Sequence, residues 1–154
     1  MVQTQAIYEY FTHHFQADSN FKLETYFKRG ILNFTNVELK MNMFKAICIT
    51  IPYLPGCKQV IFNKNGLRDE FAGLFLFGVF MNPEISSIHV MQNLMSDNFV
   101  ATLRYLLKQF PKKITDLNLT NAVHNTDDMD VMLRKIEDVT SIKSLNFRVL
   151  LCQT

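Results

Sequence analysis

The chain has 154 residues, of which 48% are apolar and 14 are phenylalanine, enough to form one domain with a hydrophobic core. Its formal net charge of +2 is close to balance, which argues against nucleic-acid binding driven by phosphate contacts. The sequence also lacks an apolar run near the roughly 18 residues that a membrane-spanning helix requires. We therefore expect no nucleic-acid partner and no membrane span.

Residues 1–28 are expected to form a helical N-terminal cap. One stripe with helical spacing includes Ile7, Tyr10 and Phe11. A second stripe, made by Leu23, Tyr26 and Phe27, predicts another helix after the polar residues 18–20.

The N-terminal segment lacks the basic start and clean apolar stretch of a secretory signal. The three cysteines form an odd set without metal-ligand spacing, which favours reduced thiols in an intracellular compartment. A cytoplasmic location is expected, and a mitochondrial or other organelle-associated location as part of a complex is the alternative.

Beyond residue 28, short apolar segments recur at a fixed distance. Their centres are Leu32, Val60, Ile88, Leu117 and Leu145, whose numbers in the chain differ by 28, 28, 29 and 28. Another apolar residue follows each centre two positions later, so each segment alternates as a strand does. The five predicted strand segments are residues 29–37, 57–65, 85–93, 114–122 and 142–150.

The stretches between these segments carry apolar residues at helical spacing. They predict helices marked by Met43, Ile47 and Ile51, by Phe71, Phe75 and Val79, by Phe99, Leu103 and Leu107, and by Met129, Ile136 and Val139. Pro55, Pro83 and Pro111, spaced 28 and 28 apart, are expected near the ends of the first three helices, because proline stops a helix.

The repeated segments resemble the leucine-rich repeat pattern L-x-x-L-x-L-x-x-N, and their spacing of 28 or 29 is similar to that of the ribonuclease-inhibitor-like subclass. The resemblance implies a short α/β solenoid, with parallel strands on its concave face and helices on its convex face. About four and a half repeats would occupy residues 29–154 and form one domain with the cap. An ordinary alternating α/β domain is the alternative.

The resemblance also assigns a role to the ninth position of the pattern. Asn65 and Asn93 are expected to satisfy backbone groups where the chain leaves the strand, whereas Ala122 and Leu150 depart from the pattern.

No residue pattern predicts catalysis, a cofactor or a metal. His13 and His14 are adjacent and would point in different directions from a helix. Ser87 and His89 share a strand that shows no carboxylate or oxyanion device. The acidic run at residues 125–130 lacks the glycine and glutamate of a calcium loop and is better explained as a helix cap.

The residues between the inward apolar positions are expected to form outward columns about 4.8 Å apart and to bind a partner. The residues expected on this concave face are Gln59, Asn63, His89, Met91, Asp116, Asn118, Asn146 and Arg148. The apolar run Val149, Leu150 and Leu151 is expected to be a second contact, because the last strand would have an unpaired edge.

We therefore expect a non-enzymatic protein-protein interaction module, an accessory or adaptor subunit in a hetero-oligomeric intracellular assembly. One alternative is a regulator, inhibitor or activator, of a partner enzyme through the concave face. Another is an enzyme with a site in the cap around Tyr10, His13 and His14.

Overall fold

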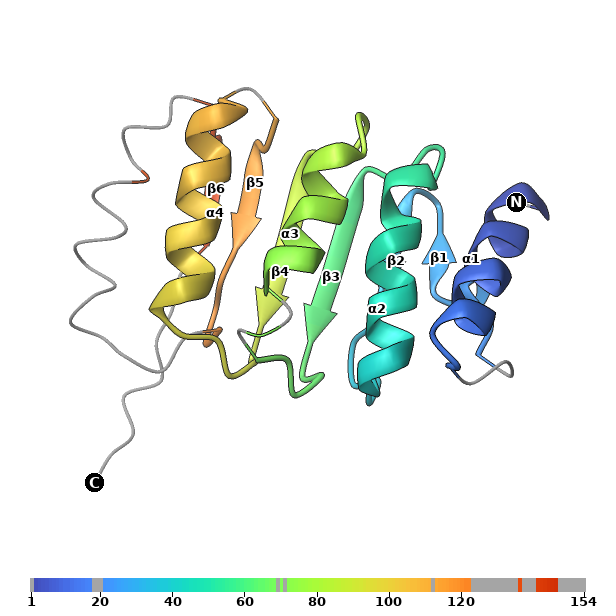
Figure 1. Cartoon of the computed structure of the whole chain (residues 1–154). Helices are drawn as coiled ribbons and strands as arrows, with labels where there is room; N and C mark the ends of the chain where they lie inside the picture. Colours follow the sequence, from blue (N-terminus) through green and yellow to red (C-terminus); the bar gives the residue numbers. More distant parts are fainter. Residues whose placement is uncertain are drawn as a thin grey trace.

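The computed structural model describes residues 2–17, 21–68, 70, 72–111, 113–122, 136 and 141–146. Within these residues the fold is α/β, with a six-stranded sheet whose strand order follows the chain order. Helices α2, α3 and α4 cover one face of this sheet, and the described elements leave the other face open (Figure 1).

The described helices and strands have these bounds in chain order. The helical elements are α1 (Val2–His14), the 3-10 turn η1 (Leu23–Thr25), α2 (Met41–Thr50), the 3-10 turn η2 (Ile51–Tyr53), α3 (Ala72–Met81) and α4 (Asp97–Gln109). The strands are β1 (Phe27–Lys28), β2 (Ile31–Asn33), β3 (Gln59–Asn63), β4 (Ser87–Met91), β5 (Asp116–Asn118) and β6 (Ser144–Asn146).

Strands β2 to β6 pair in parallel, in the register that the sequence predicts. The central residues pair as Leu32 with Val60, Val60 with Ile88, Ile88 with Leu117, and Leu117 with Leu145. The five parallel strands predicted from the spacing are therefore confirmed.

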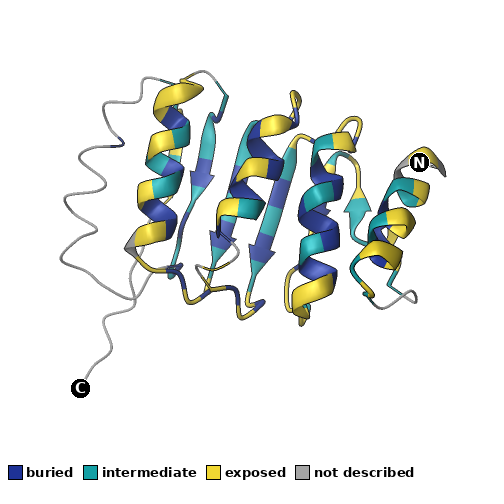
Figure 2. Ribbon diagram, viewed as in Figure 1, coloured by how far each residue is buried: buried dark blue, intermediate teal, exposed yellow. Residues whose placement is uncertain are grey.

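The core lies between the sheet and the helices. In β3 and β4 every second residue is buried and the residues between are half-buried (Figure 2). The Phe62 ring of β3 lies 5.5 Å from the ring of Phe44 in α2 and 4.9 Å from the ring of Phe75 in α3, between ring centroids. The buried set of strand residues thus faces the helices, and the half-buried set faces outward.

Two buried asparagines hold the chain where it leaves the strands, as the sequence predicts. The Asn93 amide donates to the carbonyls of Phe62 and Met91, at 3.1 and 3.0 Å, and its oxygen accepts from the backbone N–H groups of Asn65 and Leu67, at 3.1 and 3.3 Å. The Asn65 amide donates to the carbonyls of Phe34 and Val37. Each asparagine therefore satisfies buried polar groups of the preceding repeat.

In four of the strand segments, the residue before the ninth position has a left-handed backbone and turns the chain. The residues with this positive φ are Asn36, Lys64, Gln92 and Asn121, whose numbers in the chain differ by 28, 28 and 29. The turn therefore recurs with the same period as the strands.

The predicted helix ends also agree with the structure. Helix α3 ends two residues before Pro83, and α4 ends two residues before Pro111. The buried side chain of Asn82 donates to the carbonyls of Ile51 and Leu54, at 2.8 and 3.0 Å, and so satisfies the end of the preceding helical segment.

The prediction of a second helix before residue 28 is wrong. Residues 23–25 form only η1, and β1 pairs antiparallel with β2 through the two-residue turn Arg29-Gly30. Arg29 and Gly30 both have positive φ, 53° and 79°, which is the backbone that a tight hairpin turn of this length requires. The helix predicted around Met129 to Val139 lies outside the described residues except for Ile136, which is helical and buried.

In the part of the chain that the structure describes, none of the helices combines the length and the apolar character that crossing a bilayer requires.

Candidate functional site

The open face of the sheet carries side chains from the third, fifth and seventh positions of each strand segment. Those described are Ile31, Asn33, Thr35, Gln59, Ile61, Asn63, Ser87, His89, Met91, Asp116, Asn118, Thr120, Ser144 and Asn146. They are half-buried or exposed, and we call this surface the open face. Because the strands are parallel and in register, the side chains form columns across the sheet.

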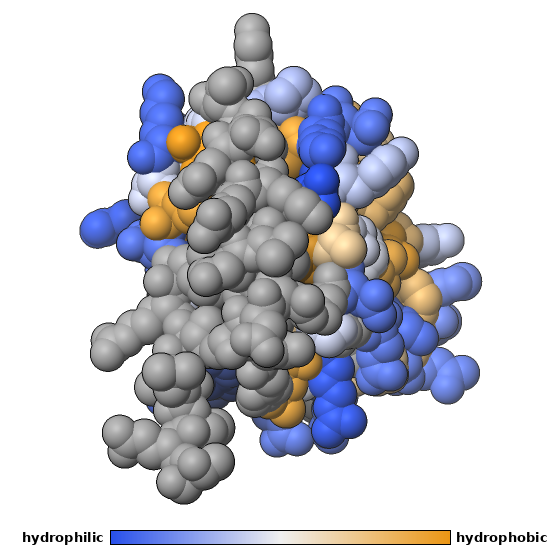
Figure 3. Space-filling view, turned by 90° about the vertical axis from the view of Figure 1, so that its left-hand side faces the viewer, coloured by the Kyte–Doolittle hydropathy of each residue, from blue (hydrophilic) through white to orange (hydrophobic). Residues whose placement is uncertain are grey.

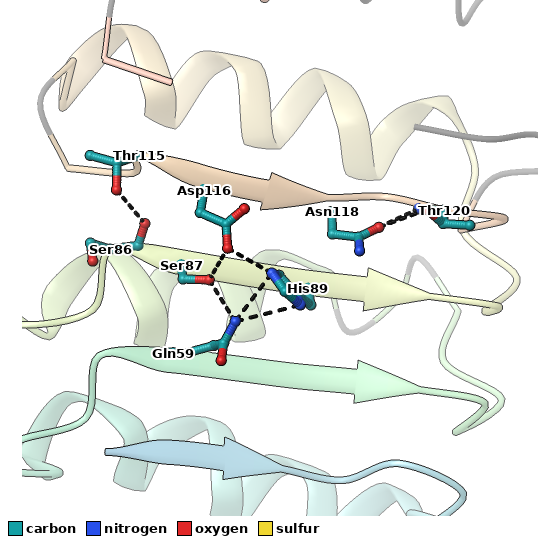
Figure 4. Close-up of polar contacts among 8 residues, drawn as sticks. All are labelled: Gln59, Ser86, Ser87, His89, Thr115, Asp116, Asn118 and Thr120. Atoms are coloured by element: carbon teal, nitrogen blue, oxygen red, sulfur yellow. Dashed lines mark hydrogen bonds and ion pairs between the residues drawn. The ribbon is translucent and has the colours of Figure 1, made fainter. Parts of the chain in front are cut away.

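A hydrogen-bonded cluster crosses three strands of the open face (Figure 4). The Asp116 Oδ2 oxygen of β5 accepts from the Ser87 hydroxyl at 2.6 Å and lies 2.7 Å from His89 Nε2. The Gln59 amide of β3 donates to the Ser87 oxygen at 2.9 Å and lies 3.1 Å from the same histidine nitrogen. The cluster therefore fixes side chains of β3, β4 and β5 relative to one another.

This cluster lowers the pKa of the Asp116 carboxyl. Partial burial would raise the pKa, but hydrogen bonds from Ser87 and His89, the nearby histidine charge and a hydrogen bond from Ser144 together outweigh it. The carboxylate is thus held in its ionised form as an acceptor, with 31% of the side chain exposed.

The arrangement is not that of an activated nucleophile. The hydroxyl of Ser87 donates to Asp116 rather than to His89, and both groups converge on the same carboxylate oxygen. In a serine nucleophile the base must accept the hydroxyl proton, and the carboxylate must hold the far side of the imidazole. The cluster therefore orients polar groups without preparing Ser87 for attack.

No carboxylate was predicted beside Ser87 and His89, because their own strand contains none. The carboxylate comes from the next strand, at the third position that Ser87 occupies in β4. The same column contains Ser144, which contributes to the lowered pKa of Asp116. Ser87 and Ser144 were absent from the predicted site, although their shared column with Asp116 was visible in the sequence.

Asparagine and threonine pairs extend the polar surface. The Asn118 oxygen accepts from the backbone N–H and hydroxyl of Thr120, at 3.1 and 2.7 Å. Asn33 and Thr35 form the same pair at 3.0 and 2.7 Å. The Asn63 oxygen has no hydrogen-bond partner, so this half-buried acceptor of the open face remains unsatisfied.

Apolar side chains cross the open face diagonally. Ile31, Ile61 and Met91 occupy the third, fifth and seventh positions of three successive strands. They are partly exposed between polar neighbours. The open face thus combines an apolar row with ordered hydrogen-bonding groups, as the surfaces of protein interfaces do.

The structure places most of the predicted concave-face residues on this one surface. Gln59, His89 and Asp116 are in contact through the cluster, whereas Asn146 is exposed on β6. Asn63, Met91 and Asn118 lie on the same face, at its fifth and seventh positions. The predicted contacts Arg148, Val149, Leu150 and Leu151 lie outside the described residues.

The remaining titratable groups that the structure describes do not assemble a metal site. Among the described residues, no three histidine, cysteine, aspartate or glutamate side chains gather to hold a metal ion. Cys48 and Cys57 are free and buried, and burial raises the pKa of both thiols, to about 12 for Cys57. His13 and His14 are exposed at the end of α1.

No family model matches this sequence, and no curated protein matches it either. Among solved structures, the fold is similar to that of leiomodin-1 actin-binding site 2. The TM-score is 0.66 at 13% sequence identity, and the likeness covers 79% of this chain and 72% of the other chain. At this identity the likeness concerns the arrangement of helices and strands.

Proposed function

We propose that this chain is a short leucine-rich-repeat solenoid of the ribonuclease-inhibitor-like subclass. Three features support the assignment: strand register that advances by one repeat from each strand to the next, buried asparagines at the ninth position, and a left-handed residue before each of them. In such an architecture each unit contacts only its neighbours, and the sheet surface is available to partners.

The proposed function is non-enzymatic protein binding, as an accessory or adaptor subunit of a larger assembly. The observation that carries it is the open face, where the cluster of Gln59, Ser87, His89 and Asp116 is ordered before any partner binds. Preorganised polar groups reduce the entropy that binding costs, and neighbouring apolar groups provide area to bury. The similarity to leiomodin-1 actin-binding site 2, whose name describes binding to a protein, is consistent with this function.

The test is a comparison of binding by the tagged native protein and by the double variant Asn118→Arg with Asn146→Arg. Both side chains belong to the open face, so two long cations should block a close-fitting partner. We expect at least one of the chains that copurify with the native protein in stoichiometric amounts to be lost. Gln109→Arg, at an exposed position on α4, is the matched control and should retain them.

The proposal fails if the open-face variant is folded and still recovers the same partners in the same amounts. It also fails if no chain copurifies stoichiometrically with the native protein after crosslinking. Circular dichroism and a melting curve establish that each variant is folded.

A further inference from the structure

Helix α3 is apolar all round, although it lies at the surface. Its sequence from Ala72 to Met81 contains no charged or hydrogen-bonding side chain. Phe77 is 58% exposed and Met81 is 53% exposed. A surface helix of a globular protein normally has polar residues on its outer side, so this exposed side is suited to cover by another molecule.

The neighbouring helical segments continue this surface at equivalent positions. We define the helix-face patch as Ile49, Tyr53, Phe77, Met81 and Tyr105. The numbers of Ile49, Phe77 and Tyr105 in the chain differ by 28 and 28, and those of Tyr53 and Met81 also differ by 28. Because the repeats stack in register, these residues form two rows across α2, η2, α3 and α4.

The exposed positions on the outer sides of α2, α3 and α4 are visible in Figure 2. Tyr53 and Tyr105 are 56% and 63% exposed. Figure 3 shows the molecule from one end, with hydrophobic side chains reaching the surface among hydrophilic ones on the right, the side of the helices. The patch lies on the opposite side of the sheet from the open face.

An apolar cleft adjoins the patch at Tyr53. Its volume is about 390 Å³, and it lies between α1 and η2. The residues lining it are Gln3, Ala6, Ile7, Tyr10, Phe11 and Tyr53. A cleft of this kind can receive a large apolar side chain, which is how anchor residues contribute most to interface affinity.

The charges on the patch's helices are mainly positive. Lys45 lies on α2, and Arg104 and Lys108 lie on α4. Among the described residues, none of these three cations is in an ion pair with a carboxylate. The Nε atom of Arg104 is buried without a hydrogen-bond partner. The acidic residue within α2, α3 and α4 is Asp97, at the first position of α4.

We propose that the helix-face patch docks an amphipathic helix of a partner polypeptide, with acidic residues flanking the apolar side of that helix. The apolar rows would bury the partner's apolar side, and its carboxylates would pair with Lys45, Arg104 and Lys108. This interface is separate from the open face, so a protein using both surfaces can connect two partners.

The test uses two synthetic amphipathic helical peptides with the same leucine face, one flanked by glutamates and the other by lysines. Each carries a fluorophore, and binding to the whole chain is measured by fluorescence polarisation. We expect the acidic peptide to bind at least about tenfold more tightly than the basic peptide, because only the acidic one complements the cations.

The double variant Phe77→Glu with Tyr105→Glu should weaken the acidic peptide by at least about tenfold, because it places charge where apolar groups would be buried. Lys45→Glu with Lys108→Glu should reduce the preference for the acidic peptide. Asn146→Glu, exposed on the open face at the other side of the sheet, controls for an added negative charge and should leave peptide binding unchanged. Asn118→Arg with Asn146→Arg should also leave it unchanged.

Four results would overturn the inference. The first is that the two peptides bind equally well or that neither binds. The second is that the folded Phe77→Glu and Tyr105→Glu variant binds the acidic peptide as tightly as the native protein does. The other two would identify a different occupant of the patch. Sedimentation equilibrium showing a dimer that this variant abolishes would identify a second copy of the chain. Cosedimentation with phosphatidylcholine and phosphatidylserine vesicles, lost in the variant, would identify a membrane surface.

Discussion

Replacing Asn93 with alanine should destabilise the fold more than replacing Asn65 does. The Asn93 side chain is 2% exposed and makes four hydrogen bonds to backbone groups, two as donor and two as acceptor. At about 1 kcal/mol for each buried bond, Asn93→Ala should lower the free energy of unfolding by about 4 kcal/mol. Asn65 makes two such bonds and its side-chain oxygen has no partner, so Asn65→Ala should cost about 2 kcal/mol by the same reckoning.

The measurement is urea denaturation followed by circular dichroism, with the slope of unfolding free energy against urea compared between variants. An unchanged slope shows that the denatured ensemble is the same and that the midpoint reports stability. The reasoning would be refuted if Asn65→Ala cost as much as Asn93→Ala, or if Asn93→Ala cost less than about 1 kcal/mol, the value of a single bond.

Three further predictions use the same measurement of unfolding free energy. Leu117→Ala should cost about 2–5 kcal/mol because Leu117 is fully buried, while Asn118→Ala should cost under about 1 kcal/mol; equal losses would contradict the strand register. Gly78→Ala should cost about 1–3 kcal/mol despite the better helix propensity of alanine, because the added carbon would overlap the carbonyl oxygen of Cys48 in α2; unchanged stability would show that α2 and α3 can separate freely. The lowered pKa of Asp116 means that its carboxylate stabilises the fold above the ordinary carboxyl pKa of about 3.9 and that this contribution is lost as pH falls through the folded-state value. Asp116→Asn should therefore flatten the decline of stability in that acidic window, and an identical pH profile would contradict the assignment.

The parallel strands could be predicted from the sequence because one local rule repeats. Apolar residues alternate within each segment, and a shift of one residue would turn Leu117 outward and Asn118 inward. The repeated spacing then fixes which residues of neighbouring strands pair. The role of the buried asparagines was implied by the resemblance to leucine-rich repeats, and it agrees with the need of a buried amide for backbone partners.

The N-terminal hairpin could not be predicted from apolar spacing. Leu23, Tyr26 and Phe27 match a helical stripe, but the adjacent turn at Arg29 and Gly30 brings Phe27 opposite Leu32 in β2. Pairing with an existing strand supplies hydrogen bonds that outweigh the weak helix preference of a short segment. The tertiary partner therefore decides the local structure at this end of the sheet.

The candidate site was predicted in outline, because the outward columns follow from strand alternation. Its central contacts join side chains of different repeats, such as His89 with Asp116 and Gln59 with His89. The pattern within one strand does not predict them, but the order of residues down the columns would have placed Asp116 beside Ser87. The exposure of the helix-face patch could not be predicted in this way, because it depends on how the helices pack against one another.

The agreement between strand order and chain order has a mechanical consequence. Within the described residues, each strand pairs with its neighbours in the sequence, and no pairing joins β1 to β6. A pulling force applied at the ends would separate the pairs one after another, rather than shearing them all at once. We expect a sawtooth of small force drops, and slow amide exchange concentrated at β3 and β4, which have paired strands on both sides and the longest ladder between them.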